Sequence, residues 1–179
     1  MRTLVLGGIR SGKSGWAEAA ITESLEPGQP VRYLATGPVV PSDTAWSERI
    51  AEHRARRPVH WSTIETCDLA KELRQAPTTP TLVDDIGGWL SATLDHRRAW
   101  ANGSVSVEVD GLLAAVASFA SQLVLISPEV GLTVVPATAS GRRFADELGM
   151  LNQRLATLCD RVVLVLAGQP VPIKPAETR

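Results

Sequence analysis

The fold of this chain of 179 residues is decided by the stretch Gly7-Gly8-Ile9-Arg10-Ser11-Gly12-Lys13-Ser14. The stretch matches G-x-x-x-x-G-K-[S/T], a pattern in which glycines let the backbone aim its N–H groups at phosphate oxygens and the lysine adds a point charge. Residues 3–6 form a short apolar run that predicts a buried strand directly before it. A helical pattern begins at Lys13, so the positive end of a helix dipole faces the same loop. The sequence therefore predicts a loop that binds nucleotide phosphates.

Outward from this loop, short β-rich runs alternate with longer helical patterns. Strands are predicted over residues 3–6, 31–36, 59–64, 79–83 and 122–127, with 161–167 as the last long strand. Helices are predicted over residues 13–25, 42–57, 67–75, 107–120 and 141–159, with one more through residues 89 and 94. Residues 97–106 and 128–140 are predicted loops. This alternation predicts an α/β fold, a mostly parallel sheet with helices on both faces. No linker divides the chain, so residues 1–179 are expected to form a single domain.

Composition excludes several classes of protein. Hydrophobic residues make up 44% and charged residues 21%, which is typical of a globular domain. Lys+Arg is 18 against Asp+Glu 19, so the strongly basic balance of a nucleic-acid binder is absent. No apolar run approaches the roughly 18 residues of a membrane span, and the apolar start is too short for a signal peptide. Cys67 and Cys159 do not fit zinc spacing. We expect a soluble cytoplasmic protein.

A carboxylate is expected near the phosphate loop, because such enzymes hold Mg²⁺ through an acid at the end of a neighbouring strand. The run Thr81-Leu82-Val83-Asp84 has this form, with apolar residues followed by an acid. The Ser14 hydroxyl and the Asp84 carboxylate are therefore the candidate ligands of Mg²⁺. Asp85 competes with Asp84 for this role, and its alternative role is to cap the following helix.

Beyond the loop, further segments resemble one family in their order and spacing. They are Leu6–Ser14, Tyr33–Thr36, Arg49–Pro58, Trp61–Glu65, Leu82–Asp84, Glu129–Leu132 with Val135-Pro136, and Gly141–Phe144 through Leu151–Gln153. The family is the bifunctional adenosylcobinamide kinase/adenosylcobinamide-phosphate guanylyltransferase of cobalamin biosynthesis. The resemblance extends from Leu4 to Lys174.

The resemblance implies a two-step enzyme on a RecA-like P-loop NTPase fold that assembles as a homotrimer. The first step phosphorylates the corrinoid adenosylcobinamide with ATP or GTP. The second transfers GMP from GTP onto that phosphate, giving adenosylcobinamide-GDP and pyrophosphate. The transfer is expected to pass through a guanylylated histidine, and the matching position here is His53.

The resemblance also implies a set of site residues. Nucleotide-binding positions are Gly7 to Ser14, Ala35, Thr36, Gly37, Arg54, Ala55, Arg56, Arg57, Glu65 and Asp84. The arginines after the histidine could offset phosphate charge as pyrophosphate leaves. A neutral imidazole is a competent nucleophile toward phosphorus. Without the resemblance, His53 on a charged helical pattern is typical of an ordinary solvated residue.

Two departures from the family pattern stand out. The family usually has Asp-Cys-Leu-Thr where this chain has Asp84-Asp85-Ile86-Gly87, and it has Asn where this chain has Pro128. Two alternatives stay open: another P-loop small-molecule kinase with no histidine intermediate, and a nucleotide-binding scaffold without turnover. The sequence leaves open whether the kinase step is retained, which nucleotide donates the phosphate, and where the corrinoid binds.

Overall fold

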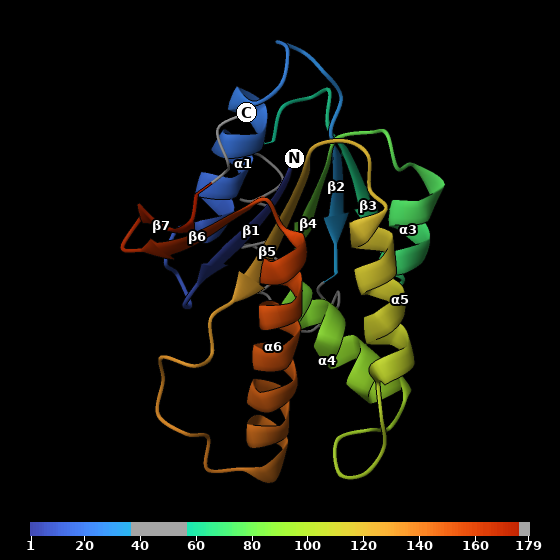
Figure 1. The fold of residues 1–179 in the computed structure, drawn as a ribbon, viewed down its shortest axis with the longest axis vertical. Coiled ribbons are helices and arrows are strands. Elements are labelled where there is room, and N and C mark those ends of the chain that lie inside the picture. The colour runs from blue at the N-terminus through green and yellow to red at the C-terminus, as the bar shows by residue number, and fades with distance from the viewer. Residues whose placement is uncertain (37–56, 176–179) are drawn as a thin grey trace.

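A computed structural model of the protein describes residues 1–36 and 57–175 (Figure 1). Its strands are β1 (Arg2–Gly7), β2 (Arg32–Ala35), β3 (Ser62–Glu65), β4 (Thr81–Asp84), β5 (Leu123–Pro128), β6 (Arg161–Leu166) and β7 (Gln169–Lys174). Its helices are α1 (Lys13–Glu23), α3 (Leu69–Gln75), α4 (Ile86–His96), α5 (Ser106–Ala117) and α6 (Ala139–Leu158). The helix predicted over residues 42–57 falls almost wholly outside the described residues.

The strands form one sheet in the order β3-β2-β4-β5-β1-β6-β7. Every neighbouring pair is parallel except β6 and β7. The predicted α/β fold with a mostly parallel sheet is confirmed. Parallel strands bring their carboxyl ends to one edge, where ligands of such sheets bind. The phosphate loop after β1 and the acidic pair Asp84-Asp85 at the end of β4 therefore lie at the same edge.

Apolar side chains cover both faces of the sheet. On one face Ala17 and Ile21 of α1 pack against Val5 and Val163, and all four are buried. The other face is covered by α3, α4, α5 and α6. The stripe Leu148, Leu151 and Leu155 of α6 is buried there as the three-to-four-residue spacing predicts. Helices thus lie on both faces, as expected. None of the helices in the described ranges combines the length and apolarity needed to cross a membrane.

The antiparallel strand β7 was not predicted, because its sequence Gln169–Lys174 carries two prolines. Proline cannot donate to a sheet ladder, so it occurs in strands mainly at a sheet edge. β7 is one of the two edge strands and is exposed along its length. It follows β6 through Ala167 and Gly168, whose φ angles of 50° and 78° suit a tight hairpin turn. The prediction that 161–167 is the last long strand was wrong, because β7 follows it and is as long as β6.

Other boundaries shift by a few residues. The predicted strand 59–64 is observed as Ser62–Glu65, and Val59 is fully exposed. Helix α6 begins at Ala139, two residues before its predicted start, because the Thr138 side chain caps it by accepting from the Gly141 N–H at 3.1 Å. The predicted 128–140 loop is shortened accordingly.

Candidate functional site

The phosphate loop joins β1 to α1 as predicted. Arg10 and Gly12 adopt positive φ angles of 56° and 91°, which turn the backbone before the first helical residue. The half-buried Lys13 reaches back over the loop, and its Nζ donates to the Gly8 carbonyl oxygen at 3.3 Å. Lys13 makes no ion pair with any described residue. The loop therefore presents backbone N–H groups, a helix N-terminus and an ammonium group that forms no ion pair with the described residues, the combination that binds phosphate.

The hairpin turn between β6 and β7 packs against the phosphate loop. The Gly168 N–H donates to the Ser11 carbonyl oxygen at 2.8 Å. A Cβ at Gly12 would lie 3.1 Å from the Gly168 Cα, and one at Gly7 would lie 2.8 Å from the Val165 carbonyl oxygen. Close backbone approach therefore favours glycine at Gly7, and at Gly12 the positive φ of 91° adds to a tight contact. The unpredicted β7 holds the predicted loop in place.

Hydrogen bonds join the carboxyl ends of β2 and β4 near the phosphate loop. The Thr36 N–H donates to the Asp84 carbonyl oxygen at 3.1 Å, and the Thr36 hydroxyl donates to the Asp85 carbonyl oxygen at 2.5 Å. The Tyr33 hydroxyl donates a short hydrogen bond to Asp84 Oδ2. Asp84 is half-buried, and its Oδ1 accepts no hydrogen bond from a described residue. With respect to the described residues, one carboxylate oxygen is therefore available to a ligand.

Asp85 has the capping role that was its alternative. It is the N-cap of α4, and its Oδ1 accepts from the Gly88 N–H at 2.6 Å. Burial and the neighbouring Asp84 carboxylate raise the pKa of Asp85, although Lys13 acts in the opposite direction. Asp84 is therefore the better magnesium candidate. A half-buried carboxylate with one open oxygen and the half-buried Ser14 hydroxyl fit Mg²⁺, which prefers oxygen ligands and keeps several waters.

The remaining predicted site residues are only partly described. Ala35 ends β2 and Thr36 follows it. The exposed Glu65 ends β3 in register with Ala35, and β3 is the edge strand opposite β7. Arg57 lies against the sheet, with its Cζ 3.3 Å from the Tyr33 ring centroid and its Nη1 donating to Thr63 Oγ1 at 2.9 Å. Five predicted positions lie outside the described residues. They are Gly37, His53, Arg54, Ala55 and Arg56.

Sequence reasoning missed Tyr33. Its exposed fraction is 1%, and it lies inside an apolar strand, a pattern typical of core packing. Burial, followed by the Asp84 carboxylate, raises the pKa of the Tyr33 phenol, so the hydroxyl stays protonated. The available signal was chemical: a buried tyrosine hydroxyl needs a hydrogen-bond partner, and the nearest strand ends in an acid.

The two departures from the family pattern lie in contact with each other. A Cβ at Gly87 would lie 2.8 Å from Pro128 Cγ. The absence of a side chain at Gly87 therefore leaves room for the Pro128 ring, where the start of α4 lies beside the end of β5. The Pro128 carbonyl oxygen accepts from Asn152 Nδ2 at 3.0 Å, which ties α6 to the same place.

A cavity of about 480 Å³ adjoins the site between the 129–136 segment and α6. Its lining includes Leu6, Glu129 and Gln153. The Glu129 N–H donates to the Gly7 carbonyl oxygen at 3.1 Å, so one wall of the cavity is attached directly to the phosphate loop.

Comparisons with known proteins match nearly the whole chain to one family. The model of a family described as "Cobinamide kinase / cobinamide phosphate guanyltransferase" matches residues 3–173. The "Bifunctional adenosylcobalamin biosynthesis protein CobP" of Pseudomonas aeruginosa is 41% identical over 180 residues, 97% of this chain and 98% of the relative. The "Bifunctional adenosylcobalamin biosynthesis protein CobU" of Escherichia coli K12 is 35% identical over 194 residues, 97% of this chain and 100% of the relative.

Among solved structures, the assembled ATPase EscN from the type III secretion system of enteropathogenic E. coli has a TM-score of 0.55 at 11% identity. The match covers 93% of this chain and 43% of that one. A sequence identity this low is evidence for a similar fold and for nothing further.

Proposed function

The chain belongs to the cobinamide kinase/cobinamide phosphate guanyltransferase family, and from this premise we propose that it phosphorylates adenosylcobinamide with ATP or GTP and then guanylylates the product. It is a transferase that binds nucleotides. The observation that carries the proposal is the family match over residues 3–173, which includes an intact phosphate loop. We propose that one domain performs both steps.

In the kinase step, the hydroxyl oxygen of the substrate bonds to the γ-phosphorus as the bond to the leaving ADP or GDP breaks. The hydroxyl proton passes to solvent. Gly7–Ser14 would hold the phosphates through backbone N–H groups, and Lys13 would offset charge on the outer ones. Ser14 and Asp84 would hold Mg²⁺, which would offset negative charge on the phosphates.

In the guanylyl transfer, a ring nitrogen of His53 would bond to the α-phosphorus of GTP as pyrophosphate leaves. A phosphate oxygen of adenosylcobinamide phosphate then displaces the histidine, giving adenosylcobinamide-GDP. Arg54, Arg56 and Arg57 would offset the charge of the departing pyrophosphate. Ala35, Thr36, Gly37, Ala55 and Glu65 complete the proposed nucleotide-binding set.

The proposal extends to assembly and location. Large apolar side chains are exposed along the 132–135 segment and on β7, including Leu132, Val134 and Ile173. Exposed apolar patches of this kind often mark protein interfaces, which supports the proposed homotrimer. A cytoplasmic location is part of the same proposal.

The decisive experiment is intact-mass spectrometry after incubation with GTP and Mg²⁺. We expect an acid-labile mass increase equal to one GMP, which is lost in His53→Ala. His60 and His96 are exposed and provide matched controls, because His60→Ala and His96→Ala should keep the label. A folded protein that binds GTP without labelling would contradict the histidine route and favour a plain P-loop kinase.

Phosphorylation of adenosylcobinamide is measured separately. His53→Ala should retain it, since the histidine serves only the second step. Phosphate transfer from ATP and from GTP is compared in the same assay, which identifies the donor. Absence of transfer from either nucleotide would restrict the protein to guanylyl transfer.

A further inference from the structure

We propose that Tyr33 is a positioning residue that holds the Asp84 carboxylate with its hydroxyl group and the Arg57 guanidinium with the face of its ring. The inference rests on the function proposed above, in which Asp84 serves the magnesium site and Arg57 the guanylyl transfer. It adds a residue that contacts both parts of the site at once.

The first contact, called here the hydroxyl arm, is the hydrogen bond from the Tyr33 hydroxyl to Asp84, and it joins two neighbouring strands. Tyr33 on β2 lies in register with Leu82 on β4, two residues before Asp84, and it donates to Asp84 Oδ2. This hydrogen bond restrains rotation of the carboxylate and leaves Oδ1 available. Partners that orient a metal-binding carboxylate in this way commonly contribute 10- to 100-fold, in order of magnitude, to metal affinity.

The second contact, called here the ring arm, is the stacking of the Arg57 guanidinium on the Tyr33 ring, and it holds Arg57 in place. The guanidinium carbon lies 3.3 Å from the Tyr33 ring centroid, and Nη1 donates to Thr63 Oγ1 on β3. The flat guanidinium group stacks on an aromatic face, which a lysine cannot reproduce. Arg57 follows His53 by four residues in the sequence. The stack therefore anchors the end of the segment that carries the proposed nucleophile.

The ring itself is held by packing, so its position does not depend on either partner. Tyr33 is buried, and the Trp61 ring lies beside it with centroids 6.4 Å apart. The phenol can therefore act as a fixed reference that orients the two charged side chains of Asp84 and Arg57. Because the two arms use different parts of one side chain, substitutions can separate them.

The hydroxyl arm is tested with Tyr33→Phe, which keeps the ring. Binding of GTP is measured by calorimetry across a range of Mg²⁺ concentrations and again in EDTA. We expect the Mg²⁺ concentration for half-maximal effect to rise about 10-fold, with unchanged affinity in EDTA and little change in thermal unfolding. Trp61→Phe is the matched control, because it perturbs the same packing but leaves the Tyr33–Asp84 bond, and it should not shift the Mg²⁺ dependence.

The ring arm is tested by comparing Tyr33→Phe with Tyr33→Leu and Arg57→Lys. At saturating Mg²⁺, Tyr33→Leu and Arg57→Lys should both label with GMP about 10-fold more slowly than Tyr33→Phe, which keeps the ring. Arg57→Lys leaves the buried core intact, so this arm is tested even where Tyr33→Leu fails to fold.

The outcomes separate this inference from the proposed function. A wild-type protein that neither labels with GMP nor shows Mg²⁺-dependent binding would overturn the proposed function. A wild-type protein that does both, with an unchanged Mg²⁺ dependence in Tyr33→Phe, would overturn the role of Tyr33. Equal losses of GTP affinity with Mg²⁺ and in EDTA would assign Tyr33 a purely structural role and would also overturn it.

Discussion

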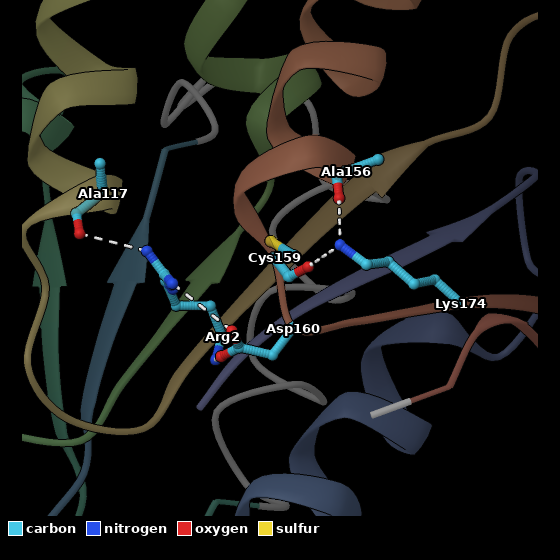
Figure 2. A network of polar contacts seen from close by, with 6 residues as sticks. All are labelled: Arg2, Ala117, Ala156, Cys159, Asp160 and Lys174. Atoms are coloured by element: carbon cyan, nitrogen blue, oxygen red, sulfur yellow. Dashed lines mark hydrogen bonds and ion pairs between the residues drawn. The ribbon is translucent and has the colours of Figure 1, made fainter. Parts of the chain in front are cut away.

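Charged groups at the amino and carboxyl ends of the parallel strands differ in whether they are paired within the protein. At the amino end, the Arg2 N–H donates to Asp160 Oδ2 at 2.7 Å, and Arg2 Nη1 donates to the Ala117 carbonyl oxygen at 3.1 Å (Figure 2). Nearby, Lys174 Nζ donates to the Cys159 and Ala156 carbonyl oxygens, which close the end of α6. These charges are satisfied within the protein.

At the carboxyl end, charge is kept available. Lys13 Nζ has one carbonyl contact and no ion pair among the described residues, and Asp84 keeps one oxygen open. The amino ends of the parallel strands thus carry a paired, structural cluster, and the carboxyl ends of β1 and β4 carry groups left for a ligand. Charged residues at the amino end should therefore matter for stability, and those at the carboxyl end for binding.

The largest expected effect is that of Lys13→Ala. Loss of the ammonium group should reduce turnover of nucleotide by about 10²–10³-fold, because one preorganised charge on a transferring phosphate contributes on that order. Thermal unfolding without nucleotide should hardly change, since only one weak contact is lost. Lys71→Ala is the control, because Lys71 is exposed on α3 and should affect neither property. A large loss of stability in Lys13→Ala would break the contrast between the two ends.

The carboxyl end also depends on backbone closeness, which Gly12→Ala tests. Alanine would have to adopt a φ of 91° with its Cβ 3.1 Å from the Gly168 Cα, so we expect a loss of about 1–3 kcal/mol in the free energy of unfolding. The control is Gly15→Ala on α1, where a Cβ meets nothing within 4 Å and should stabilise by up to about 1 kcal/mol. Urea unfolding of both variants gives the comparison. Equal stabilities would refute the close approach of the two loops.

The contrast also separates what the sequence could predict from what it could not. The phosphate loop and α1 were predictable because the motif is local and its glycines, lysine and helix start are consecutive. Asp84 was predictable as a strand-ending acid. Tyr33 and Gly168 were not, because their roles depend on which strands become neighbours and on a proline-bearing edge strand that local propensity opposes. His53 was found through resemblance, since a histidine among charged residues carries no local signal.

A smaller effect is expected where the two departures meet at the carboxyl edge. Gly87→Ala places a Cβ 2.8 Å from Pro128 Cγ, and the overpacking should outweigh the gain in helix propensity by about 1 kcal/mol. Pro128→Ala removes the ring that causes the clash. In the double variant, Gly87→Ala should cost nothing further or become stabilising, a coupling of about 1 kcal/mol measurable by urea unfolding. Strict additivity would show that the two positions are independent.

The smallest expected effect concerns the paired end of β1, through Asp160→Asn. Partial burial raises the pKa of Asp160, but the Arg2 N–H and guanidinium more than offset this and hold it below its ordinary 3.8. A depressed folded-state pKa stabilises the fold above the unfolded pKa, and this contribution is lost as the pH falls through the folded value. With the carboxylate 41% exposed, the variant should lose about 0.5–1 kcal/mol at pH 7.

The difference between Asp160→Asn and the wild type should shrink as the pH falls below 3.8 and through the depressed folded-state pKa, because the Asp160 carboxylate then becomes protonated. Unfolding in urea at pH 7, 5 and 3 follows this change. Asp110→Asn is the matched control, because the Asp110–Arg154 pair is more exposed, at 62% and 51%, and should contribute less at every pH. Nucleotide affinity should be the same in all three proteins. A loss of affinity in Asp160→Asn would show that the two ends of β1 are coupled, and the division between paired and available charge would then fail.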